Sequence, residues 1–183
     1  MDIETATQTG TLSALYASSK PDAVAVMDAT DQRTFRELHE NANRLARAFQ
    51  NAGLSSGDGV ALVCSNRCEF IEVLLACLRS GLRLTPVNWH LSHSDAEYII
   101  SNCEAKALLI EDRFVDSIWS GGEIHVDLAL CIGLAKPGLK SYAEVISQVD
   151  PDDLSAPVHG NIMLYTSGTT GRPKGVVYPL VGV

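Results

Sequence analysis

The sequence has little positive charge. Its 183 residues include 14 lysines and arginines against 22 aspartates and glutamates, so the formal net charge at pH 7 is −8. A protein surface that binds DNA or RNA normally carries a basic patch that meets the phosphate backbone. We therefore expect no nucleic acid among the partners of this protein.

Long apolar runs are missing as well. A membrane-spanning helix needs about 18 or more consecutive apolar residues, whereas the longest candidate run, from Phe70 to Leu78, is interrupted by Glu72. The N-terminal residues Met1 to Thr5 show neither the basic segment nor the apolar segment of a secretory signal. The sequence therefore predicts a cytoplasmic protein without a transmembrane segment.

Cysteine pairs suited to a disulfide framework or a metal centre are also lacking. The cysteines are odd in number and scattered through apolar segments: Cys64, Cys68, Cys77, Cys103 and Cys131. No second Cys or His pair stands at zinc-finger spacing from Cys64 and Cys68. We interpret the cysteines as buried thiols of a reducing compartment and predict no metal site. His90 and His93 precede a predicted helix, where surface or capping roles suit them better than a ligand role.

What the chain does contain is an alternation of apolar strands and amphipathic helices. Apolar residues make up 46% of the sequence, enough for a substantial core in about one domain. The predicted strands cover residues 23–27, 58–65, 82–87, 107–110, 128–132, 162–165 and 175–178. The predicted helices cover residues 12–19, 34–52, 70–80, 94–102, 113–119 and 141–148. This alternation is typical of an α/β fold with a largely parallel sheet and helices on both faces.

The best-defined helix begins after Thr34. Glu37 stands three residues later and completes a capping box, in which each side chain accepts a hydrogen bond from the other residue's backbone N–H. Gly53 is a suitable terminator. Apolar residues recur between them at steps of three and four and define one core-facing side: Phe35, Leu38, Ala42, Leu45 and Phe49.

One segment carries most of the polar chemistry. The apolar residues Ile162 to Tyr165 lead into hydroxyls and glycines, followed by Pro173, Lys174 and a second apolar run. Glycine lets the backbone approach a ligand closely, and successive backbone N–H groups in a concave loop bind anions. With the hydroxyls and one ammonium group, they form a candidate polyphosphate cradle: Thr166, Ser167, Gly168, Thr169, Thr170, Gly171 and Lys174.

Other interpretations of this segment exist. Segments rich in serine, threonine and glycine between strands are usually solvated turns, and Lys174 would then be an ordinary turn lysine. The two common nucleotide-binding loops do not apply, because the segment contains neither G-x-x-x-x-G-K-[ST] nor G-x-G-x-x-G.

The segment from Tyr165 to Val176, YTSGTTGRPKGV, resembles the phosphate-binding signature of the adenylate-forming enzymes. This superfamily comprises acyl-CoA synthetases, nonribosomal peptide adenylation domains and beetle luciferases. Landmarks similar to the N-terminal part of acyl-CoA synthetases appear upstream in the family's order, at residues 34–38, 43–46, 57–61, 66–67 and 87–88. The resemblance therefore spans residues from about 30 to 177 and favours the phosphate interpretation over a solvated turn.

The resemblance implies a fold and a chemistry. The chain would be the N-terminal portion of the adenylate-forming fold, an α/β structure that is incomplete by itself. Its parts would be a flexible N-terminus (1–10), an α/β subdomain of the AMP-binding domain (11–149), a linker (150–159) and the phosphate-binding segment with the start of the next subdomain (160–183). The family uses ATP and Mg²⁺ to activate a carboxylic acid as acyl-AMP, and coenzyme A then takes the acyl group. By resemblance, the seven cradle residues would hold the β- and γ-phosphates and guide pyrophosphate out.

The resemblance also implies that most of the family's active site lies beyond Val183. The motif near the adenine, the aspartate that grips the ribose, the hinge and the C-terminal domain with its catalytic lysine would follow there, and Leu180 stands about where relatives have a histidine. We therefore assign no catalytic residue to this chain. One interpretation is the N-terminal part of an ATP-dependent acyl-CoA synthetase for a carboxylic acid, with fatty acids as the family-level expectation. The other is a non-catalytic α/β fragment that at most binds polyphosphate weakly or pairs with another chain.

Overall fold

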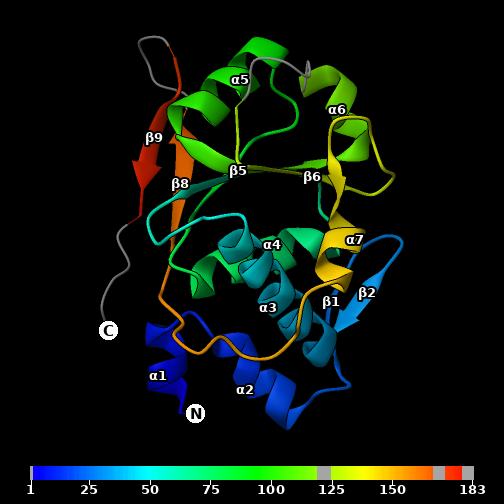
Figure 1. Cartoon of the computed structure of the whole chain (residues 1–183), viewed down its shortest axis with the longest axis vertical. Helices are drawn as coiled ribbons and strands as arrows, with labels where there is room; N and C mark the ends of the chain where they lie inside the picture. Colours follow the sequence, from blue (N-terminus) through cyan, green and yellow to red (C-terminus); the bar gives the residue numbers. More distant parts are fainter. Residues whose placement is uncertain (1, 119–124, 167–171, 179–183) are drawn as a thin grey trace.

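The computed structural model describes residues 2–118, 125–166 and 172–178 (Figure 1). The helices in these ranges are α1 (Ile3–Gln8), α2 (Leu12–Ser19), α3 (Phe35–Asn51), α4 (Cys68–Arg79), α5 (His93–Asn102), α6 (Asp112–Ile118) and α7 (Tyr142–Ser147). The strands are β1 (Val24–Met27), β2 (Gln32–Thr34), β3 (Gly59–Val63), β4 (Arg83–Pro86), β5 (Ala105–Glu111), β6 (Leu128–Ile132), β7 (Lys140–Ser141), β8 (Asn161–Thr166) and β9 (Lys174–Val177). Helices and strands alternate over most of the chain, as the sequence predicts.

Strands β3 to β9 form a seven-stranded sheet in the order β7-β6-β5-β3-β4-β8-β9. Strands β3 to β8 pair in parallel, whereas β9 pairs antiparallel with β8. Every residue of the central strand β3 is buried, which suits the continuous apolar sequence of a parallel strand covered on both faces. The predicted largely parallel sheet is confirmed.

Helices cover both faces of this sheet (Figure 1). Helices α3, α4 and α7 pack on one face, around a core that includes Phe49 and Leu109. Helices α5 and α6 pack on the other face, around a core that includes Ile100 and Leu108. Leu108 and Leu109 are neighbours in β5 and belong to different cores, because successive side chains of a strand point to opposite faces. The prediction of helices on both faces of the sheet is confirmed.

Helix α3 is capped as the sequence predicts. The Thr34 hydroxyl accepts from the Glu37 N–H at 3.2 Å, and the Glu37 carboxylate accepts from the Thr34 N–H at 2.8 Å. These bonds satisfy donors that a helix start otherwise leaves free. Phe49 near the other end is fully buried, and Gly53 follows the helix with a φ of +88°, which glycine adopts without strain.

The N-terminus, predicted to be loose over residues 1–10, is helical over part of its length. Helix α1 forms because the Asp2 carboxylate accepts from the Thr5 N–H at 2.8 Å and caps the helix start. Gly10 then packs against α4 so closely that an added Cβ would lie 2.2 Å from the Leu78 carbonyl oxygen. The segment is therefore held by a cap and by tertiary packing, neither of which its polar composition indicates.

Some boundaries also differ from the prediction. Strand β2 is not among the predicted strands, and it pairs antiparallel with β1. The short strand β7 was not anticipated by an apolar run, and it pairs with β6 through two residues. For helix α5 the sequence allows two caps, Ser92 with Asp95 or Ser94 with Glu97. The helix begins at His93, because Ser92 caps it by accepting from the Asp95 N–H.

The sheet continues across the predicted linker at residues 150–159. Strand β8 pairs in parallel register with β4, with Asn161 opposite Arg83. Residues on both sides of the linker therefore belong to the same sheet. The division into subdomains at this linker stays a prediction.

The cysteines are buried free thiols, as predicted. Burial raises the pKa of the Cys64 thiol to about 12, so this group keeps its proton at neutral pH. Over the ranges that the structure describes, no helix is long and apolar enough to cross a membrane. The same ranges contain no group of three or more His, Cys, Asp or Glu side chains that could hold a metal ion.

Candidate phosphate-binding site

The candidate site lies at the carboxyl end of β8. Because the strands from β3 to β8 run parallel, their carboxyl ends meet at one edge of the sheet, where α/β proteins commonly bind ligands. The predicted phosphate segment begins at this edge with Thr166, the last residue of β8. The predicted phosphate segment therefore begins at the edge of the sheet where α/β proteins commonly bind ligands.

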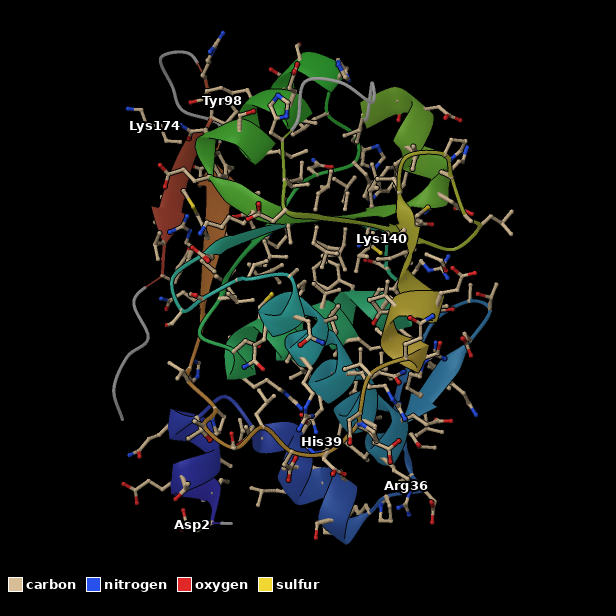
Figure 2. The ribbon with its side chains drawn as sticks, in the orientation of Figure 1. Asp2, Arg36, His39, Tyr98, Lys140 and Lys174 are labelled. Atoms are coloured by element: carbon tan, nitrogen blue, oxygen red, sulfur yellow. The ribbon has the colours of Figure 1, made fainter. Side chains whose placement is uncertain are left out.

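Thr166 and Lys174 lie directly opposite each other in the β8–β9 pair. Lys174 is labelled in Figure 2. Opposed residues of an antiparallel pair project from the same face, so the hydroxyl and the ammonium group share a face of the hairpin. Both residues are exposed, and within the described part of the chain no carboxylate forms an ion pair with Lys174. The other predicted cradle residues lie outside the described residues: Ser167, Gly168, Thr169, Thr170 and Gly171.

The other face of the same hairpin packs on helix α5. The Tyr165 hydroxyl donates to Asn102 Oδ1 at 2.7 Å, and Met163 and Tyr165 pack against the core beneath the helix. Burial raises the pKa of Tyr165 to about 12, so the hydroxyl keeps the proton that it donates. Arg172 places its guanidinium carbon 4.9 Å from the centre of the Tyr98 ring, a cation–π contact. Helix α5 thus contacts β8 and a residue that lies two positions before β9.

The sequence did not predict the contacts that Asn102 makes with Tyr165 and Tyr98 makes with Arg172. Asn102 is 63 residues away from Tyr165 along the chain, and a single sequence carries no signal for such a contact. The only local hint is the four-residue spacing of Tyr98 and Asn102, which puts them on one face of a helix. That spacing does not reveal what the face contacts.

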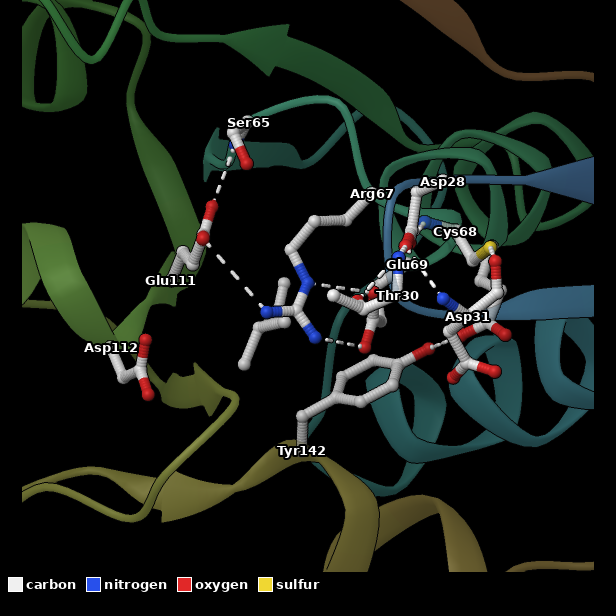
Figure 3. Close-up of polar contacts among 12 residues, drawn as sticks. Asp28, Thr30, Asp31, Ser65, Arg67, Cys68, Glu69, Glu111, Asp112 and Tyr142 are labelled. Carbon is white, nitrogen blue, oxygen red and sulfur yellow. Dashed lines mark hydrogen bonds and ion pairs between the residues drawn. The ribbon is translucent and has the colours of Figure 1, made fainter.

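A second polar cluster lies at the carboxyl ends of β3 and β5 (Figure 3). Glu111 is 4% exposed, accepts from the Ser65 N–H at 2.9 Å and pairs with Arg113 Nε at 2.7 Å. Arg67 pairs with Glu69 at 2.9 Å and lies 3.9 Å from Glu111. These charges neutralise one another, and we assign no ligand to the cluster.

The sequence profile of AMP-binding enzymes matches residues 14–180, and the chain belongs to this family. Among its relatives, the fatty acid–[acyl-carrier-protein] ligase ScoC of Streptomyces coeruleorubidus is 32% identical over 162 residues, covering 88% of this chain and 31% of that protein. A 2-succinylbenzoate–CoA ligase of Bacillus licheniformis is 34% identical over 162 residues, covering 88% of this chain and 32% of that protein. The chain thus spans about a third of the length of the curated relatives that it matches.

Solved structures share the fold. The anthranilate CoA ligase AuaEII in complex with anthranoyl-AMP superposes with a TM-score of 0.85 at 23% identity, covering 93% of this chain and 34% of that chain. The N-terminal domain of FACL13 from Mycobacterium tuberculosis superposes with a TM-score of 0.76 at 26% identity, covering 93% of this chain and 44% of that chain. The α/β fold is therefore that of the N-terminal part of adenylate-forming enzymes.

Proposed function

We propose that this chain is the N-terminal part of an ATP-dependent acyl-CoA synthetase. In that reaction a carboxylate attacks the α-phosphate of ATP, which gives acyl-AMP and pyrophosphate, and the thiol of coenzyme A then takes the acyl group. One observation carries the proposal: in a chain of the AMP-binding family, Thr166 and Lys174 lie opposite each other at the carboxyl end of β8.

In this proposal the Thr166 hydroxyl and the Lys174 ammonium group bind the β- and γ-phosphates of ATP. A charge-assisted hydrogen bond from an ammonium group to a phosphate is stronger than a neutral one, and it stabilises the charge that develops on the leaving pyrophosphate. The remaining cradle residues add hydroxyl and backbone N–H donors. Mg²⁺ would supply further neutralisation of the phosphates, and we assign no residue of this chain to it.

The substrate class that we propose is a carboxylic acid, in particular a fatty acid. A medium/long-chain-fatty-acid–CoA ligase of Mycobacterium tuberculosis is 30% identical over 168 residues, which supports this choice together with the fatty-acid ligase ScoC. The 2-succinylbenzoate–CoA ligase points to an aromatic acid instead. The experiment that distinguishes fatty from aromatic acids is to compare the rates at which the full-length protein forms acyl-CoA from each class.

Replacement of Lys174 tests the phosphate site directly. We expect Lys174→Ala to weaken the binding of MgATP and of inorganic pyrophosphate, measured by isothermal titration calorimetry. A hydrogen bond to a charged group contributes about 1.5–3 kcal/mol, so the affinity should fall roughly tenfold or more, and Lys174→Arg should retain part of it. Lys140→Ala is the matched control, because it removes the same charge from β7, at the opposite edge of the sheet (Figure 2). Equal affinities of wild type and Lys174→Ala would contradict the proposal.

The second candidate function is a non-catalytic fragment that binds polyphosphate or pairs with another chain. The coverage of only about a third of the relatives' length favours it for the isolated chain. We expect the purified chain to show no carboxylate-dependent pyrophosphate exchange and no acyl-CoA formation. Detection of either activity, together with its loss in Lys174→Ala, would overturn this candidate.

A further inference from the structure

Helix α5 contacts the β8–β9 hairpin at two points, one in β8 and one just before β9. On the β8 side, Tyr165 next to Thr166 donates its hydroxyl proton to Asn102 Oδ1 at 2.7 Å. On the β9 side, Arg172 lies with its guanidinium carbon 4.9 Å from the centre of the Tyr98 ring. Along the hairpin, the two contacts therefore lie on either side of the opposed pair Thr166 and Lys174.

The two contact residues of α5 form one platform. Tyr98 and Asn102 are four residues apart, so they project from the same face of the helix. The helix itself is fixed, because Ile99 and Ile100 are buried in the core on this side of the sheet and Ser92 caps its first turn. A rigid element of this kind can hold attached groups in a constant geometry.

Each contact joins a half-buried tyrosine to an exposed partner. Tyr98 is half-buried, and Asn102 and Arg172 are exposed. Contacts with an exposed partner add little to global stability. Their main consequence is local, since they restrain the strand ends that carry Thr166 and Lys174.

We propose that Tyr98 and Asn102 are positioning residues for the phosphate site. By holding Tyr165 and Arg172, they fix the Thr166 hydroxyl and the Lys174 ammonium group relative to each other before a polyphosphate binds. Groups that are already placed lose less conformational freedom on binding, and the affinity rises accordingly. The inference rests on the proposed function of Thr166 and Lys174 as phosphate ligands.

The first test measures the affinity of the whole chain for inorganic pyrophosphate. Tyr98→Leu removes the aromatic face and should weaken binding roughly twofold to fivefold, the range of an exposed cation–π contact. Tyr98→Phe keeps the face and should bind like the wild type. Asn102→Ala should weaken binding similarly, and Tyr165→Phe should add nothing to that variant, because both remove the same hydrogen bond.

A double-mutant cycle separates positioning from direct binding by Arg172. If Arg172 acts only through Tyr98, Arg172→Gln weakens pyrophosphate binding in the wild-type background and has no further effect in Tyr98→Leu. Additive losses would mean that Arg172 binds the ligand itself and would overturn its part in the platform. The thermal midpoints of the variants, expected to match that of the wild type, show that each one folds.

Hydrogen exchange tests the platform without any ligand. Tyr98→Leu and Asn102→Ala should speed exchange of the backbone amides of β8 and β9, while Tyr98→Phe should not, and the amides of α3 serve as an internal reference.

Unchanged pyrophosphate affinity in Tyr98→Leu would overturn the positioning role, whatever the exchange rates show. If the wild type does not bind pyrophosphate, or if Lys174→Ala binds as tightly as the wild type, the proposed function fails and the positioning role fails with it. If Lys174→Ala alone weakens binding, only the positioning role fails.

Discussion

At the scale of single residues, Gly175 sets how closely the hairpin packs under α5. A Cβ added there would lie 2.0 Å from Met163 Cε and 3.0 Å from Tyr165 Cζ. Tyr165 is directly opposite Gly175 in the strand pair, and its hydroxyl reaches Asn102. A glycine opposite an aromatic residue leaves room for the ring to lie across the backbone. The glycine that follows Lys174 therefore serves the packing of the hairpin.

We expect Gly175→Ala to lower the free energy of unfolding by about 1–3 kcal/mol, as overpacking usually does. The flexible end of Met163 can move away, but the Tyr165 ring is held by Asn102 and has to shift. Urea denaturation measures the change. Val176→Ala on the exposed face is the control, with an expected effect within about 0.5 kcal/mol. Equal stability of Gly175→Ala and wild type would show that the ring already has spare room.

At the scale of elements, helix α3 binds residues 150–153, here called the strap, which lead from α7 toward β8. Arg47 donates to three backbone carbonyls of the strap. Asn43 donates to the Pro151 carbonyl at 2.9 Å, and His39 Nε2 lies 2.7 Å from Asp153 Oδ1. His39 faces the strap in Figure 2. One polar face of α3 thus holds a segment that has no regular structure of its own.

His39 links the strap to a buried arginine. The fully buried Arg79 brings its Nη1 within 3.3 Å of His39 Nδ1. Because a guanidinium only donates, Nδ1 accepts, and the ring proton resides on Nε2, from which it is donated to Asp153. Ser13 Oγ also lies 3.0 Å from Nδ1 and accepts from Arg79. Burial, and then the charge of Arg79, lower the pKa of His39, while Asp153 and Glu40 oppose that shift.

This arrangement predicts that the chain loses stability as the pH falls below about 6.5. An unfolded histidine has a pKa near 6.5, and that of folded His39 is lower. Between the two values the unfolded chain binds more protons, so protonation favours unfolding, and the loss is complete below the folded pKa. His39→Gln keeps an N–H donor for Asp153 and does not titrate.

The measurement is the free energy of unfolding from urea denaturation at a series of pH values between about 7 and 5. We expect His39→Gln to show a flatter dependence on pH than the wild type over this window. The other histidines are common to both proteins, so the difference between the two curves belongs to His39. Parallel curves would contradict the assignment of a neutral, proton-donating His39.

At the scale of the whole molecule, one apolar surface of the described structure is uncovered. Leu164 and Val176 are opposed on the hairpin face that points away from α5, and they are 38% and 46% exposed. Tyr178 follows them and is 56% exposed. Within the described residues β9 pairs only with β8 and forms an edge of the sheet. Exposed apolar edge strands promote association between chains.

We expect the chain to associate at high concentration and Val176→Lys to suppress this association, because a charged residue on an edge strand opposes edge-to-edge pairing. Light scattering over a concentration series measures the effect. Leu134→Lys is the control: Leu134 is 78% exposed, but it follows β6 and lies away from the β9 edge. Suppression by Leu134→Lys to the same extent would attribute the effect to net charge and contradict a role of the edge.

The sequence by itself determined the features that depend on near neighbours. Thr34 and Glu37 cap α3 across three residues, and the apolar runs define the strands of a parallel sheet. The segment from Tyr165 to Val176 indicated the family, which the match over residues 14–180 confirms. Such features could be predicted because their physical cause lies within one turn of helix, one strand or one loop.

Only the tertiary structure decided the contacts between distant segments. His39 and Asp153 are 114 residues apart, and Tyr165 and Asn102 are 63 residues apart. Neither contact produces a repeating pattern of residues from which it could be predicted. Glu72, which interrupts an apolar run, is fully buried and accepts a hydrogen bond from the Tyr142 hydroxyl at 2.6 Å. Burial of a charged or polar side chain depends on a partner that another element supplies. Which face of α5 contacts the β8–β9 hairpin, and which part of α3 holds the strap, therefore follow only from how the layers pack.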